Sequence, residues 1–162
     1  MPSPSTSLIF GAPIGPIPMP TPLAGGQQVS FATAQSLLPI HILVPTDSLA
    51  NASNLTTVWV SQEQGSVDLE YGGGAVSIIE QPPYKGDPAT AFASFVNQVE
   101  NQGGKAAVGT VQGQPALVIW PNTDPMGPNP AFVEWVSGST DVQISSDAYS
   151  VDQLLAIAGG MR

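Results

Sequence analysis

The sequence predicts an α+β domain, in which a curved, mostly antiparallel sheet of about seven to eight strands has three helices packed on one face. Short β-branched and apolar segments follow one another through brief turns, a spacing typical of hairpins rather than of βαβ crossovers. Three other segments have apolar residues at helical spacing behind a capping residue. Hydrophobic residues make up 42% and charged residues 9% of the chain, so a core can be buried.

Residues 1–28 are predicted to be a proline-rich, disordered linker, and residues 29–162 to form one domain. Seven prolines fall within the first 22 positions. Each lacks an amide donor and restricts the residue before it to extended geometry, so we expect a polyproline-II-like tether. The alternative is a ligand for proline-reading domains, but residues 17–20 match such motifs poorly.

The first part of the domain is predicted to contain one helix and a three-stranded meander. Ser30 caps a helix over 31–38, and Pro39 ends it. A short apolar strand is expected at 40–44, closed by Pro45. The strands of the meander are expected at 55–62, 66–71 and 75–81.

A longer helix begins the second part. Asp87 is its predicted N-cap, Pro88 occupies its first position, and it runs to about Asn101. Two hairpins and a final helix follow, the helix starting at Ser150 and ending at Ala158. The strands of the hairpins are expected at 106–111, 116–120, 132–136 and 142–145.

The charge balance excludes several classes of function. Twelve acidic residues against three basic ones give a net charge of −9. Lys85, Lys105 and Arg162 cannot form a basic face, so nucleic acids and anionic membrane surfaces are not expected partners. Without cysteine there is no disulfide, thiolate nucleophile or zinc–thiolate site. We find no signal-peptide pattern and no apolar segment of membrane-spanning length.

Candidate catalytic groups are few. His41 is the only imidazole and lies in an alternating apolar run, which is typical of a structural or surface histidine. An acid-dependent hydrolase would need two carboxyls converging in one cleft with separated pKa values. Asp68 and Glu70 share a strand face with Cβ atoms ~7 Å apart, but their alternation with apolar residues predicts the solvent side of a hairpin. Glu134 and Asp141 are predicted to lie on neighbouring strands and to face solvent too.

Three tryptophans are candidate ligand-binding residues. A concave sheet face lined by tryptophan and apolar residues can hold a lipid or a peptide. The alternative is that these indoles fill the core between helices and sheet. The sequence predicts no catalytic residue, no metal site and no cofactor. The candidate ligand-binding residues are Trp59, Trp120 and Trp135.

Several short motifs follow one another in a particular order: Phe31–Gln35, Pro39, Val44–Asp47, Val67–Tyr71, Ile78–Gln81, Glu134–Trp135 and Ser150–Ala158. In this order they resemble an uncharacterised bacterial domain family over about residues 30–160. Its members occur as the extracytoplasmic part of membrane-anchored anti-sigma-factor-like and sporulation-associated proteins, and as lipoproteins. The resemblance implies a sheet clasped by helices, similar to lipoprotein-carrier folds, without established enzymatic activity or functional residues. This sequence departs from those proteins in having neither the anchoring helix nor the cytoplasmic sigma-binding region.

Together these features predict a non-enzymatic extracytoplasmic sensor or binding domain, located in the periplasm or at the cell surface as part of a membrane-anchored signalling protein. Its expected partner is a protein or a hydrophobic ligand, and an edge strand offers a route to a homodimer. One alternative is a carrier of lipid or hydrophobic peptide in a cavity of ~300 Å³ or more between sheet and helices. The second alternative is a carboxylate-dependent hydrolase.

Overall fold

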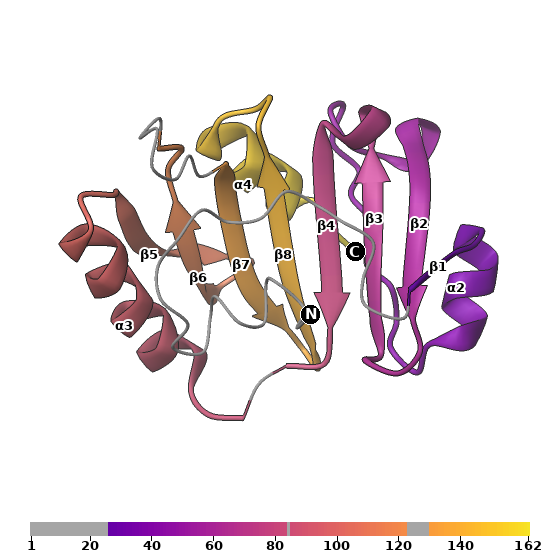
Figure 1. Ribbon diagram of the computed structural model, residues 1–162, viewed down its shortest axis with the longest axis horizontal. Coiled ribbons are helices and arrows are strands. Elements are labelled where there is room, and N and C mark those ends of the chain that lie inside the picture. The colour runs from indigo at the N-terminus through magenta and orange to yellow at the C-terminus, as the bar shows by residue number, and fades with distance from the viewer. Residues whose placement is uncertain (1–25, 84, 123–129) are drawn as a thin grey trace.

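The computed structural model describes residues 26–83, 85–122 and 130–162, which build one antiparallel sheet of eight strands (Figure 1). Three helices pack against this sheet, so the predicted α+β class is confirmed. The order of strands across the sheet is β1-β2-β3-β4-β8-β7-β6-β5. The strands are β1 (Gln27–Gln28), β2 (Leu55–Ser61), β3 (Ser66–Tyr71), β4 (Val76–Gln81), β5 (Ala106–Val111), β6 (Gln114–Ile119), β7 (Ala131–Ser137) and β8 (Thr140–Ser146).

The sheet consists of two four-stranded halves, β1–β4 and β5–β8, in which strands that follow one another in sequence are neighbours. The pairing of β4 with β8 is the one ladder among the described strands that joins the two halves. It aligns Ser77 with Ser145 at one end and Gln81 with Asp141 at the other. We call this pairing the central seam, and Figure 1 shows it in the middle of the sheet.

The helices are divided between the two faces of the sheet rather than gathered on one. α2 (Phe31–Leu37) and α4 (Val151–Gly159) pack on the face that carries the larger hydrophobic cluster, which we call the main-core face. α3 (Pro88–Asn101) packs against β5 and β6 on the opposite face, which we call the α3 face. The reason is that β6 and β7 have apolar side chains on both of their faces. Those under α3 are Leu117, Ile119 and Phe132, and those in the main core are Ala116, Val118 and Val133.

All three predicted helix N-caps are confirmed. The side chain of Ser30 accepts a hydrogen bond from the amide of Thr33 in α2. The side chain of Asp87 accepts a hydrogen bond from the amide of Thr90 in α3, and Pro88 follows Asp87 as the first residue of the helix. Ser150 forms a reciprocal capping box in α4. The local sequence therefore fixes where each helix begins.

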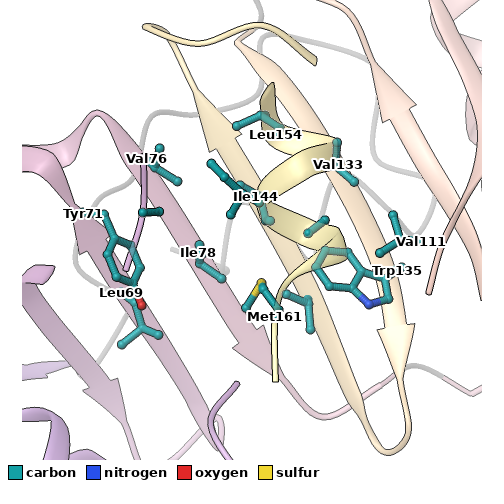
Figure 2. Close-up of a cluster of buried hydrophobic side chains, with 14 of the residues drawn as sticks. Leu69, Tyr71, Val76, Ile78, Val111, Val133, Trp135, Ile144, Leu154 and Met161 are labelled. Atoms are coloured by element: carbon teal, nitrogen blue, oxygen red, sulfur yellow. The ribbon is translucent and has the colours of Figure 1, made fainter. Parts of the chain in front are cut away.

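The main core lies between α4 and the centre of the sheet. Figure 2 shows Ile78 of β4 and Ile144 of β8 meeting across the central seam beneath Leu154 of α4. Trp135 and Tyr71 are fully buried in the same cluster, one in each half of the sheet. Burial of this continuous apolar layer joins the two halves into one domain.

The segment 40–44, predicted as a strand, joins no sheet. The amide of Ile42 donates to the side chain of Gln35. The amide of Leu43 donates to the carboxyl of Glu80. These two amides therefore donate to side chains instead of to the backbone carbonyls of a neighbouring strand. The segment is unpaired along most of its length for this reason.

Several other boundaries differ from the prediction by one or two residues, among them the start of the domain and the start of β6. Gln27–Gln28 pairs with β2, so the domain starts before residue 29, while residues 1–25 of the predicted linker lie outside the described residues. β6 starts at Gln114 because the preceding turn needs only Gln112 and Gly113, both with positive φ (51° and 78°). Two consecutive positive φ values are what the tightest hairpin turns require.

Candidate functional site

Polar side chains gather on the α3 face beside the central seam. Strand pairing places Asp141 directly opposite Gln81, and Gln143 directly opposite Glu134. These four side chains are at most 5% exposed. We call Gln81, Glu134, Asp141 and Gln143 the carboxyl cluster.

The two glutamine amides connect the cluster across three strands. Nε2 of Gln143 donates to Oε1 of Glu134 at 3.1 Å and to Oδ2 of Asp141 at 3.2 Å. Nε2 of Gln81 donates to the same Asp141 oxygen at 3.1 Å. Because Gln81 belongs to β4 and Asp141 to β8, the hydrogen bond between these two side chains crosses the central seam.

The two carboxyls are close enough to share a proton. Burial raises the pKa of Glu134 well above its ordinary value, and the negative charge of Asp141 and a hydrogen bond to it raise this pKa further. Burial also raises the pKa of Asp141, against hydrogen bonds from Glu134, Gln81 and Gln143 that lower it. When the pair holds a single proton, that proton is therefore on Glu134, which donates it to the Asp141 carboxylate, as expected for like acids in one buried site.

Three acceptor atoms of the cluster are buried without a partner. They are Oε2 of Glu134, Oδ1 of Asp141 and the amide oxygen of Gln143. A buried polar atom left unpaired costs about 1–3 kcal/mol. The proton held between Glu134 and Asp141 supplies a donor for the carboxyl pair alone, so the Gln143 amide oxygen is left without one, and a donor-bearing group would satisfy it.

Asp68 lies on the same face, on β3. It is fully buried, so the prediction that it faces solvent is wrong, whereas Glu70 is half-buried. Burial raises the pKa of Asp68 to about 7; the hydroxyl of Ser77, donating at 2.7 Å, lowers it and the charge of Glu70 raises it. β3 lies between β2 and β4 inside the sheet, so both of its edges are paired. The predicted solvent exposure of Glu134 and Asp141 is also wrong, although their places on neighbouring strands are confirmed.

Glu80 is a fourth buried carboxyl, and it lies on the main-core face. Burial raises its pKa to about 8, while the hydrogen bond from the Leu43 amide, at 2.7 Å, lowers it. Its second oxygen and the hydroxyl of Tyr71 are both unpartnered, and burial together with the charge of Glu80 raises the Tyr71 pKa. Glu80 was not among the candidates predicted from the sequence. The signal that could have found it is its alternation with Val76 and Ile78, which places all three side chains on the core face of the strand.

The structure does not bring the three candidate tryptophans together. Trp135 is fully buried in the main core. Trp120 is half-buried against the same core, with the Lys105 ammonium 4.4 Å from its ring centroid. Trp59 is paired with Asp68 and lies on the α3 face. His41, by contrast, is exposed.

Within the described ranges, no three histidine, cysteine or acidic side chains are arranged to hold a metal ion. No described helix is long and apolar enough to cross a membrane. Comparison of the chain with protein-family models, curated proteins and solved structures finds no match.

Proposed function

We propose that this chain is a non-enzymatic extracytoplasmic binding domain whose ligand site is the carboxyl cluster. The observation that carries the proposal is the buried amide oxygen of Gln143 without a donor, beside two buried carboxyls that have one proton between them. The amide oxygen of Gln143 matters most here, because a proton bound by the carboxyls does not satisfy it. The ligand class that fits is a cation with several N–H donors, which is a primary ammonium or a guanidinium group.

The electrostatics of the chain favour such a ligand. The net charge is −9, so the mean field of the protein attracts cations. No lysine, arginine or histidine in the described part of the chain contributes to the pKa values of Glu134 and Asp141. A ligand cation would replace the shared proton, so binding releases a proton and strengthens as pH rises.

The setting outside the cytoplasm is supported by the resemblance to an extracytoplasmic bacterial family and by a surface with few charges. In that setting the domain would sense or hold its ligand for a larger membrane-anchored protein. The carrier of a lipid or hydrophobic peptide is the alternative function. Native mass spectrometry with organic extraction of the purified protein separates the two, because a carrier retains an extractable lipid or peptide in stoichiometric amount.

A carboxylate-dependent hydrolase is a second candidate, favoured by one observation. Glu134 and Asp141 converge and share a proton, which is the arrangement of carboxyl pairs that act as general acid and general base. In that role Glu134 would donate the proton and Asp141 would accept one. Hydrolysis of peptide or glycoside substrates at acidic pH that disappears in Glu134→Gln would establish the enzyme and overturn the binding domain.

The experiment for the binding domain uses three small probes of equal chain length: n-butylammonium, n-butylguanidinium and, as the neutral control, n-butanol. Each is titrated into 15N-labelled protein at pH 5 and at pH 8.5. We expect the cations to shift the side-chain amide resonances of Gln81 and Gln143. They should also bind at least ~10-fold more tightly at the higher pH, a difference in binding free energy comparable to that of one charge-assisted hydrogen bond.

Two variants make this test specific. Glu134→Gln keeps the shape of the side chain but removes its charge, and it should abolish the difference between the two pH values. Glu100→Gln, an exposed change on α3, should leave the titration unaltered. Equal shifts from n-butanol, or cation shifts confined to residues outside the cluster, would overturn the proposed site.

A further inference from the structure

Buried carboxyls lie along the central seam on both faces of the sheet. Glu80 belongs to β4, and the next residue, Gln81, pairs with Asp141 of β8, so Glu80 on the main-core face and Asp141 on the α3 face lie at the Gln81–Asp141 end. Glu134 on β7 and Asp68 on β3 are level with the Ile79–Gln143 pair in the middle of the seam, and Asp68 contacts Ser77 toward its other end. The seam is thus lined by four acids that have no exposed surface.

The groups that face these acids are neutral donors or further acids. Gln81 and Gln143 donate to the carboxyl pair, the Ser77 hydroxyl to Asp68 and the Leu43 amide to Glu80. Two further titratable groups act on them: Glu70, whose charge raises the pKa of Asp68, and Tyr71, which is paired electrostatically with Glu80. The charged or titratable residues of the other packed segments are His41 of segment 40–44, Arg162, whose backbone pairs with Val44, Glu100 of α3 and Asp152 of α4, all exposed.

We propose that the central seam is a proton-operated gate over the carboxyl cluster. With the four acids neutral or sharing protons, β4 and β8 stay paired and the cluster is closed. When the acids lose their protons as pH rises, Glu80 on one face and Asp141 with Glu134 on the other become like charges with no buried counter-charge among the described residues, and the seam opens at the Gln81–Asp141 end. The inference rests on the proposed function only in taking the cluster as the site that opening uncovers, and it explains how a ligand reaches groups with no exposed surface.

The two ends of the seam differ, which gives the opening a direction. At the Gln81–Asp141 end the contacts depend on ionisable groups. At the other end, beyond the Ser77–Ser145 pair, the Ser146 hydroxyl donates to the carbonyl of Ala75 at 2.6 Å. A hydroxyl–carbonyl contact carries no charge over this pH range. One ionisable contact, from Ser77 to Asp68, lies at this end, against the carboxyls of Glu80, Asp141 and Glu134 toward the other. The seam should therefore fray from the Gln81–Asp141 end first.

Amide hydrogen exchange of the ligand-free protein tests the gate. Exchange is measured at pH 5.5 and 8.5 and corrected for the intrinsic pH dependence of the exchange chemistry. We expect the protection of residues 79–81 and 141–143 to fall roughly 100-fold, corresponding to about two pKa units of uncompensated charge. Protection near residues 75–77 and in the β5–β6 hairpin should change much less.

The variant Glu134→Gln/Asp141→Asn keeps the side-chain shapes and should retain protection of the seam at pH 8.5. Glu80→Gln, which keeps an acceptor for the Leu43 amide beside Gln81, provides a second variant in case the double change fails to fold. Glu100→Gln is the matched exposed control. Unchanged protection at the seam, or an equal loss in every strand, would overturn the gate. Because no ligand is present, either result is independent of whether butylammonium or butylguanidinium binds the cluster.

Discussion

The dependence of stability on pH is the sharpest consequence of burying Asp68. Its pKa is about 7 in the folded protein against an ordinary value of 3.8. The folded state therefore holds a proton that the unfolded state has already released between these two pH values. This contribution to stability is fully present below pH 4 and is lost as pH rises through about 7. A difference of about 3 units corresponds to about 4 kcal/mol.

The variant Asp68→Asn removes this titration while keeping an acceptor for the Ser77 hydroxyl. We expect its free energy of unfolding to be close to that of the parent protein at pH 4. At pH 8 it should exceed that of the parent by up to about 4 kcal/mol. Urea unfolding at pH 4, 6 and 8, followed by tryptophan fluorescence, measures both values, with Glu100→Gln as the exposed control.

Two results would refute this reasoning. One is a parent protein whose stability increases from pH 4 to pH 8, as happens when folded carboxylates are stabilised by cations. The other is an Asp68→Asn variant that is destabilised equally at every pH, which would mean that the aspartate is ionised and satisfied in the folded state.

Three further substitutions follow from the structure. Glu80→Gln keeps an acceptor for the Leu43 amide, so it should change little at pH 4 and stabilise the protein increasingly from about pH 4.5 to about pH 8, where the unfolded state has released the proton that folded Glu80 still holds; equal effects at pH 4 and pH 8 in urea unfolding would contradict this. Gly104→Ala should destabilise by about 1–3 kcal/mol, because the added Cβ would lie 2.7 Å from Cγ1 of Val99; thermal unfolding checks this, and an unchanged Tm would show that the helix end yields. Ser30→Ala removes the N-cap of α2 and should cost about 1 kcal/mol; Ser30→Asp, which restores a cap, is the control, and a loss in both variants would contradict the capping role.

Local chemistry accounts for the part of the fold that the sequence predicts well. Ser30, Asp87 and Ser150 cap their helices where expected, because an N-cap depends only on the next three residues. The alternation in 66–71 likewise assigns Val67 to the core face correctly. Both kinds of signal lie within one turn or one strand of the residues that they determine.

Non-local pairing accounts for the part that the sequence analysis missed. Alternation separates the two faces of β3 but does not say that the face with Asp68 is buried. Gln81 and Asp141 are sixty residues apart, and they meet only because β4 pairs with β8. The segment 40–44 fails as a strand for a similar reason, since the distant Glu80 carboxyl takes one of its amides. The three tryptophans were grouped by residue type, whereas Trp59 lies on the α3 face, Trp135 is inside the main core, and Trp120 follows β6 at the border of that core.

Direct measurement of the Glu134 and Asp141 titrations tests the central claim of a proton shared between buried acids. Carboxyl 13C chemical shifts are followed from pH 3 to 10, and Glu134→Gln and Asp141→Asn assign the two signals. The shared proton predicts two separated steps, with both pKa values raised above their ordinary values and that of Glu134 raised well above it. Two independent titrations near the ordinary pKa values of 3.8 and 4.5 would contradict it.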